Sequence, residues 1–222
     1  MSTLQQIRED CYSFLEETSD NTHITPQVMN SFINRAQEMT AVLSESVKDS
    51  VEWVVEKGVG AYTLPSDNLL ISSAYFGDKD KKNDLKPIDI FTEESLKSIH
   101  PFWLDETTDS EGQPTKLLWL DRLTVFLFPR PNTEFSTNKK LVVYYIFNPA
   151  SLTQDSQSPN LHLVYHQVLK FYALYLCYMK LKNEKMSTKF YQDWIKHYEI
   201  VKGILSKGAE ELFRWKWNFV EE

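Results

Sequence analysis

Hydrophobic positions recur at helical spacing near both ends of the chain. The first run predicts a helix that starts after Thr3, where a capping-box pattern with Gln6 can satisfy free backbone groups. A second helix is expected from Thr25-Pro26 to near Ser46, because proline at the first helical position loses no hydrogen bond. Late in the chain, residues 161–182 form an apolar run and a further amphipathic run starts near Ser187. The spacing therefore predicts four helices, two before and two after the central part.

Between these helices the pattern changes to β-branched and aromatic runs, which suit a pleated sheet. The expected strands cover residues 51–55, 69–76, 116–120, 123–128 and 140–147. Residues 77–87 are read as an exposed charged loop, and Thr92 as the cap of a short helix. These elements predict an α+β fold, mainly α, in which a helical bundle of N- and C-terminal helices carries an inserted small antiparallel β-sheet or sandwich. The predicted divisions are 1–48, 49–150, 151–211 and a C-terminal docking tail, 212–222.

Composition narrows the function classes. The 222 residues are 42% hydrophobic, which supports a core, and the net charge of −7 argues against a dedicated nucleic-acid binder. Cys11 and Cys177 both fall on apolar helical faces and are expected to be buried free thiols. The most apolar stretch, 161–181, contains too many polar groups to span a membrane, and the first residues do not resemble a signal peptide. We therefore expect the protein to be made in, and to stay in, a reducing cytoplasm until it assembles.

One histidine pair is a candidate metal site. His162 and His166 stand four apart, on one face of the expected helix. A zincin-type motif needs a glutamate directly after its first histidine, but Leu163 occupies that position. A third ligand would have to come from His197 or His100. The favoured interpretation is structural, with no metal, no cofactor and no catalytic residue, because no phosphate-binding loop or nucleophile elbow is present and the acidic runs are typical of solvated faces.

Two segments are candidate contact sites. In the tail, Phe213, Trp215, Trp217 and Phe219 alternate with Arg214, Lys216 and Asn218, which would place all four aromatics on one face of an extended strand. They either pack back on the bundle or dock on a partner, where aromatic anchors dominate binding energy. In the charged loop, Lys79, Lys81 and Lys82 either form a solvated tip or contact an acidic neighbour.

An ordered series of short motifs runs along nearly the whole chain. The series is Phe32-Ile33-Asn34-Arg35-Ala36, Tyr62-x-Leu64-Pro65-x-Asp67, Glu111-Gly112-Gln113-Pro114, Phe128-Pro129-Arg130-Pro131, Leu141-Val142-Val143-Tyr144-Tyr145 leading to Asn148-Pro149 and Leu152, and His162-Leu163-Val164-Tyr165-His166. Each motif alone is common turn or strand chemistry. In this order and spacing, they resemble the head-to-tail adaptor proteins of tailed bacteriophages, also called head-completion, connector or tail-tubular proteins.

The resemblance implies a structural virion protein at the head–tail junction, without catalysis. It implies a homo-oligomeric ring, twelvefold in the best-known relatives, bound to the phage portal protein on one side and a tail hub or nozzle protein on the other. DNA would pass through the channel without specific binding, and the C-terminal segment would reach the portal. Two alternatives stay open: a neck or tail-completion ring protein, and a small virion-associated hydrolase that uses a carboxylate pair or the His162/His166 face.

Overall fold

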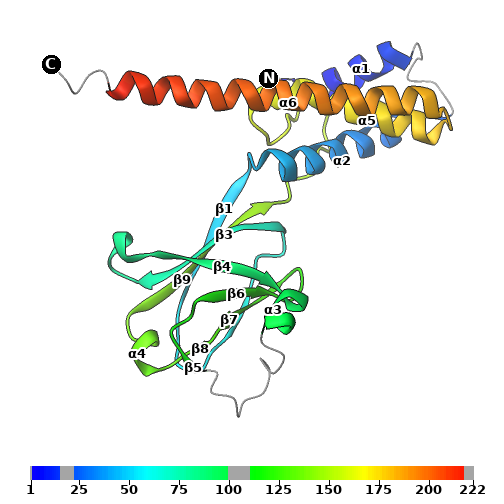
Figure 1. Ribbon diagram of the computed structural model, residues 1–222. Helices are drawn as coiled ribbons and strands as arrows, with labels where there is room; N and C mark the ends of the chain where they lie inside the picture. Colours follow the sequence, from blue (N-terminus) through cyan, green and yellow to red (C-terminus); the bar gives the residue numbers. More distant parts are fainter. Residues whose placement is uncertain (1, 16–22, 100–110, 218–222) are drawn as a thin grey trace. The chain divides into compact units, whose positions relative to one another are not determined.

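The chain divides into two compact units. The computed structural model describes residues 2–15, 23–99 and 111–217, with the backbone alone for residue 82 and residues 206–217. One unit, the helical unit, is formed by Met1–Val47 together with Pro149–Glu222. The other, the β unit, is formed by Lys48–Asn148. Figure 1 shows the longer helices in the first unit and the strands, with short helices among them, in the second.

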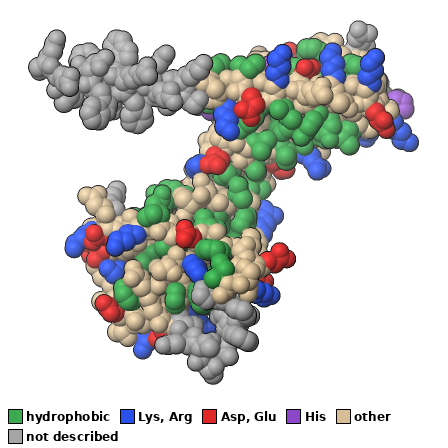
Figure 2. All heavy atoms as spheres, in the orientation of Figure 1, with side chains coloured by type: hydrophobic (Ala, Val, Ile, Leu, Met, Phe, Trp, Pro, Cys, Tyr) green, Lys and Arg blue, Asp and Glu red, His purple; other side chains and the backbone are tan. Residues whose placement is uncertain are grey.

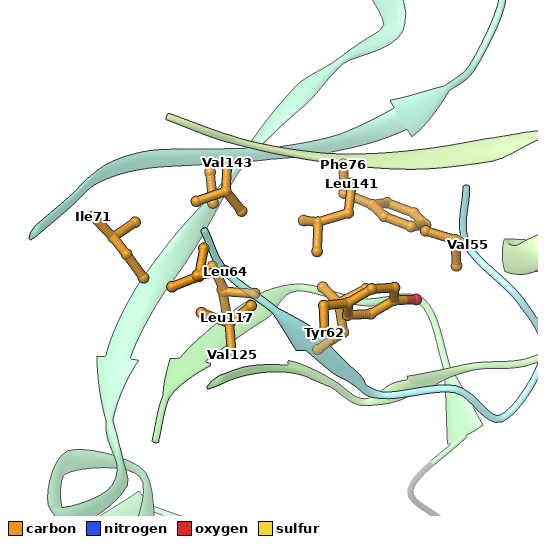
Figure 3. Close-up of a cluster of buried hydrophobic side chains, with 11 residues drawn as sticks. Val55, Tyr62, Leu64, Ile71, Phe76, Leu117, Val125, Leu141 and Val143 are labelled. Carbon is orange, nitrogen blue, oxygen red and sulfur yellow. The ribbon is translucent and has the colours of Figure 1, made fainter. Parts of the chain in front are cut away.

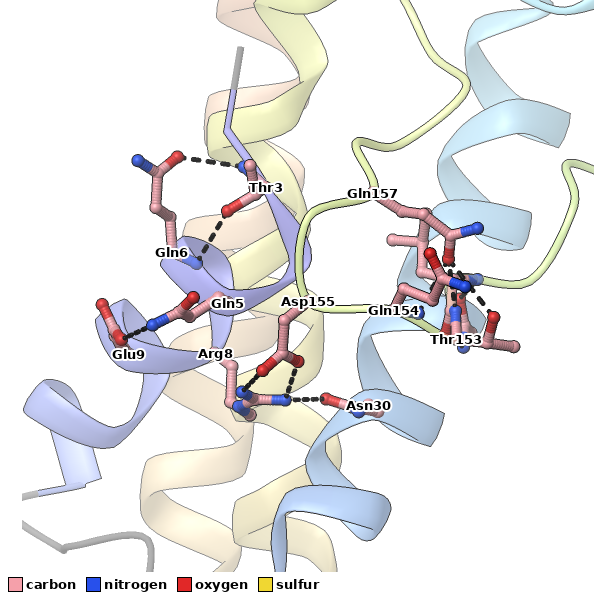
Figure 4. Close-up of polar contacts among 12 residues, drawn as sticks. Thr3, Gln5, Gln6, Arg8, Glu9, Asn30, Thr153, Gln154, Asp155 and Gln157 are labelled. Atoms are coloured by element: carbon pink, nitrogen blue, oxygen red, sulfur yellow. Dashed lines mark hydrogen bonds and ion pairs between the residues drawn. The ribbon is translucent and has the colours of Figure 1, made fainter.

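Four α-helices build the helical unit. They are α1 (Leu4–Leu15), α2 (Pro26–Ser44), α5 (His166–Lys180, preceded by the short η2, Leu163–Tyr165) and α6 (Glu184–Trp217). The capping residues expected from the sequence form hydrogen bonds at the starts of α1 and α2. The Thr3 amide donates to Gln6 Oε1 at 3.0 Å, and the Gln6 amide donates to Thr3 Oγ1 at 3.3 Å (Figure 4). At α2, Thr25 Oγ1 accepts from the Val28 amide, with proline at the next position.

The interior of the helical unit is apolar and includes both cysteines. Leu4, Ile33 and Leu169 are fully buried. Cys11 and Cys177 are buried free thiols, which confirms the prediction from their positions on apolar faces. Burial raises the pKa of the Cys11 thiol far above its usual range, so this thiol stays protonated and unreactive.

A polar network fastens the segment that precedes η2, around residues 152–155, to the first two helices. Asn34 bonds Leu152 in both directions, with its Nδ2 donating to the Leu152 carbonyl at 3.1 Å and its Oδ1 accepting from the Leu152 amide at 2.8 Å. Arg8 forms two bonds of 2.9 Å to the carboxylate of Asp155 (Figure 4). The Arg8 guanidinium thereby lowers the pKa of Asp155. These bonds hold the irregular segment around residues 152–155 in one conformation against α1 and α2.

Seven strands form the main sheet of the β unit. They are β1 (Lys48–Val54), β2 (Ala61–Thr63), β3 (Asn68–Asp78), β4 (Lys86–Thr92), β6 (Lys116–Trp119), β7 (Thr124–Phe128) and β9 (Lys139–Phe147). Their order is β1-β9-β3-β4-β6-β7-β2, and every pair is antiparallel except β4 with β6. The short β5 (Glu111–Gly112) and β8 (Arg130–Pro131) form a separate parallel pair. Three short helices complete the unit: η1 (Lys82–Asp84), α3 (Glu93–Ile99) and α4 (Thr133–Ser136).

The main sheet curls until its two edge strands meet. Trp53 on β1 and Tyr62 on β2 have ring centroids 5.4 Å apart, although β1 and β2 share no ladder. Side chains from β3 and β9 point across the interior toward those of β2, β6 and β7 (Figure 3). Leu117, Leu127 and Leu141 are fully buried there. The sheet is therefore nearly closed and barrel-like, with its own hydrophobic core.

The predicted fold class is wrong in its proportions. The β unit is not a small antiparallel insert in a helical bundle, since its main sheet has seven strands, includes one parallel pair and encloses a separate core. The five expected strands omit β2 and β4 of the main sheet and the short β5 and β8. Strand β4 falls between the expected loop, 77–87, and the expected helix cap at Thr92. Two expected strands were also too short, because β3 extends to Asp78 and β1 starts at Lys48. The strands beyond those expected widen the sheet until its two edges meet through the rings of Trp53 and Tyr62.

Candidate functional site

The helix α6 is much longer than the helix that it packs against. It has 34 residues and α5 has 15, so α6 is 19 residues longer, about 28 Å at 1.5 Å per residue. Aromatic contacts fix its first half, including Tyr172 with Trp194 (ring centroids 4.7 Å apart) and Tyr165 with Tyr198 (6.1 Å). Trp194 and Tyr198 are 2% and 6% exposed. The second half extends past the end of α5.

The predicted docking tail starts inside this helix. The backbone of Phe213, Arg214, Trp215, Lys216 and Trp217 is α-helical, whereas Phe219 lies outside the described residues. The interpretation of these five positions as an extended strand is therefore wrong. Side-chain alternation does not hold along a helix, which turns by about 100° per residue.

On a helical backbone, a different set of positions in this segment lies on one face: those spaced by three and four residues. Buried Trp194 and Tyr198 are followed at alternating spacings of three and four residues by Val201, Leu205, Gly208, Leu212 and Trp215. We call these positions the α6 seam. A spacing of three and four keeps positions on one face of a helix. The face that binds α5 at Trp194 and Tyr198 thus has an apolar continuation in the projecting half of α6.

The charged tip of the β unit is more ordered than a free loop. The Lys79 amide donates to the Asn138 carbonyl at 2.9 Å. Asn138 adopts a left-handed conformation (φ 56°), and its Nδ2 donates to Asp80 Oδ2 at 3.0 Å and Asp78 Oδ1 at 3.3 Å. Lys79 and Lys81 are exposed on this framework, and only the backbone of Lys82 is described. Lys79 and Lys81 are therefore exposed side chains on a backbone that hydrogen bonds hold in place.

Gly77 explains how the tip folds so tightly. A Cβ at this position would collide with the backbone carbonyl of Asp84 in η1. The end of β3 can therefore approach η1 only without a side chain at position 77. This close approach holds Lys81 and Asp84 at the same end of the unit, where their charged atoms lie 3.9 Å apart.

The histidine pair does not form a joint site. His162 lies before η2 in extended backbone and is exposed, so the expectation that it shares a helix face with His166 is wrong. His166 is 3% exposed, with Nε2 3.2 Å from the Leu161 carbonyl, and burial lowers its pKa. His197 stacks on Phe171, and His100 lies outside the described residues. Within residues 2–15, 23–99 and 111–217, no three His, Cys, Asp or Glu side chains gather as a metal site.

Among the helices in the described ranges, none combines the length and the apolar character needed to cross a bilayer.

Comparison with known proteins identifies the family. No curated protein matches the chain. The family model described as SU10 adaptor protein matches residues 2–209, which include the β unit and the helical unit as far as the second half of α6. This match confirms the resemblance to phage head–tail adaptors drawn from the motif series. The chain belongs to the SU10 adaptor protein family and is therefore a phage adaptor protein, a structural component of the virion.

Proposed function

We propose that this adaptor is the subunit of a homo-oligomeric ring, twelvefold as in the best-known relatives, that connects the portal to the tail and continues the DNA channel. The family match over residues 2–209 carries the proposal, because it extends through both units. The charge supports the channel role: at −7, the chain favours passage of DNA over retention. The ring would occupy the head–tail junction after assembly in the host cytoplasm.

The portal contact is assigned to the projecting end of α6. The α6 seam continues beyond the end of α5, and the same part of the sequence carries the tail residues Phe213, Arg214, Trp215, Lys216, Trp217 and Phe219. Tryptophan and arginine are enriched among the residues that dominate interface energies. An amphipathic helix with apolar positions every three or four residues fits a hydrophobic groove of a partner protein. We therefore assign the portal side a groove that accepts a helix.

The tail contact is assigned to the tip of the β unit. Lys79, Lys81 and Lys82 stand where the end of β3, η1 and Asn138 come together. Cations on a preordered backbone lose less conformational freedom on binding than cations on a flexible loop. Such charges steer and select a partner, here an acidic surface on a tail hub or nozzle protein or on the next subunit.

A truncation tests the portal assignment. Removing residues 214–222 should leave a folded protein, because the buried anchors Phe190, Trp194 and Tyr198 of α6 are retained. The truncated protein should no longer co-sediment with portal rings of the same phage. Leu212→Glu should have the same effect by placing a charge on the α6 seam, and Lys207→Glu, off the seam, is its control. Normal portal binding by the truncated protein would overturn the assignment. Binding to tails but not to portals would instead favour a neck or tail-completion ring.

A further inference from the structure

A groove lies between α5 and α6 at the end where the two helices are joined. Its volume is about 470 Å³, and it is lined by Tyr175, Met179, Lys182, Asn183, Glu184 and Ser187. Met179 is 52% exposed, although it is a large apolar side chain. The apolar surface continues along α6, because the rings of Tyr175 and Tyr191 are 5.2 Å apart and Tyr191 and Ile195 are each 41% exposed.

This groove has the features of a binding surface for a helix. Two antiparallel helices form its walls, and a third helix can pack its ridge of side chains between them. Tyrosine and methionine are enriched at interfaces relative to other surfaces. In the view of Figure 2, hydrophobic side chains gather over α2 and α5 on the surface of the helical unit. Exposed apolar surface of this kind marks interaction sites in soluble proteins.

The same chain carries a helix segment that fits such a groove. Ile200 and Ile204 are 50% and 59% exposed and lie one turn apart on one flank of α6. Within the described residues, neither isoleucine is covered. Exposed Glu199 and Lys202 lie beside them, while Lys182 and Glu184 line the groove. Each surface thus offers one cation and one anion to the other, in addition to its apolar side chains.

A chain cannot fill its own groove with this segment. Helix α6 forms one wall of the groove, starting at Glu184, and continues away from it. Ile200 is 16 residues further along, about 24 Å at 1.5 Å per residue. The segment could return to the groove only by breaking the helix. The groove that accepts the Ile200–Ile204 segment must therefore belong to another copy of the chain.

We infer that, in the ring of the proposed function, the Ile200–Ile204 segment of each copy packs into the α5–α6 groove of the next copy. The contact joins two different surfaces, which is the type of contact that links successive copies around the axis of a ring. It uses anchors at positions i and i+4, as helices bound in grooves do. The α6 seam lies on another flank of the helix, so its end stays available for the portal.

Cysteine pairs test this contact in assembled rings. In the variant with Ile204→Cys and Met179→Cys, mild oxidation of rings assembled on portals should give a ladder of disulfide-linked oligomers on a non-reducing gel. The native cysteines are buried and add little background. The matched control pairs Ile204→Cys with Ile99→Cys, since Ile99 is also an exposed isoleucine (53%) but lies on α3 in the β unit. Rings that assemble without a ladder above this control would overturn the contact and leave the ring intact. If the unmodified protein forms no ring with portals, the proposed function fails, and the contact fails with it.

A second variant tests the energetic role of the contact. Ile204→Glu replaces an exposed helix residue, so the monomer should keep its circular dichroism spectrum. A charge in the groove of the next copy should lower the occupancy of copies on portal rings about tenfold or more. Ile99→Glu should leave this occupancy unchanged. Equal occupancy for Ile204→Glu and the unmodified protein would contradict the inference.

Discussion

Trp53 and Tyr62 join the two edges of the β unit: their rings lie 5.4 Å apart, one on β1 and the other on β2. No backbone ladder links these strands, so side-chain packing closes the sheet. Tyr62 is 7% exposed, and its hydroxyl donates to the Val59 carbonyl at 3.2 Å in the segment that joins the two strands. Desolvation of this hydroxyl raises the pKa of Tyr62 to about 12. The closure also protects part of the β1 edge, which could otherwise pair with another chain.

Removing the Trp53 ring should loosen the closed sheet. Trp53→Ala is expected to lower the free energy of unfolding by about 3 kcal/mol, because the ring is partly buried against the core. Tyr62→Phe should cost only about 1 kcal/mol, since it removes one hydrogen bond and keeps the ring. Chemical denaturation followed by fluorescence measures both changes. A Trp53→Ala protein as stable as Tyr62→Phe would show that this pair does not close the sheet.

Two glycines should respond in opposite directions to alanine. Gly77→Ala places a methyl group against the Asp84 backbone and should destabilise the β unit by about 1–3 kcal/mol. Gly203→Ala places a methyl group in open space within α6 and should stabilise the helix by about 0.5–1 kcal/mol, because alanine restricts the unfolded chain. Thermal unfolding followed by far-ultraviolet circular dichroism distinguishes the two. A tolerated Gly77→Ala would mean that β3 and η1 do not approach closely.

Buried His166 should make the stability of the helical unit depend on pH. Because burial lowers the pKa of His166 in the folded chain, the unfolded chain takes up the proton first. The contribution of neutral His166 to the free energy of unfolding is therefore complete above about pH 6.5, the ordinary pKa of histidine. It declines as the pH falls toward the lower pKa of His166 in the folded chain. Urea titrations at several pH values should show this decline. In His166→Gln, which keeps a donor near the Leu161 carbonyl, the decline should disappear; in His162→Gln, an exposed control, it should persist.

Reversing the charges of the β-unit tip should affect tail joining but not portal binding. The triple variant Lys79→Glu, Lys81→Glu, Lys82→Glu keeps the Asn138 bonds that order the backbone. Its association with tails should be weakened about tenfold or more at low salt, and less so at high salt, where screening reduces the original attraction. Pull-down of tails at two ionic strengths measures the effect. Unchanged binding at both would show that the tip is only a solvated loop.

Sequence patterns predicted the local elements better than their assembly. The helix starts at Thr3 and Thr25 depend on capping by neighbouring residues, so they could be read directly. Strand β4 could not be predicted from local sequence. Pro87 interrupts its start, and its parallel partner β6 lies far along the chain. Closure through Trp53 and Tyr62 likewise depends on tertiary contacts that no local pattern encodes.

The α6 seam and the α5–α6 groove could be predicted only in part, because both depend on the length and packing of the helices. Alternating aromatics at Phe213, Trp215 and Trp217 favoured a strand over a helix, but the period of three and four residues that starts at Trp194 is longer and continues through the same segment. A test of both periods over the whole C-terminal third would have found it. The α5–α6 groove had no sequence signal, because Tyr175 and Met179 look like core residues until the length of the partner helix is known.

Imaging of portal rings with and without this protein tests the central claim most directly. Mixed with portal rings of its own phage, the full chain should add a second, coaxial ring with one symmetry and with α6 directed at the portal. The protein alone can remain monomeric without affecting this expectation, because the portal supplies the template that offsets the entropy of association. Portal particles that stay unchanged at saturating protein would contradict the claim that this adaptor forms the ring between portal and tail.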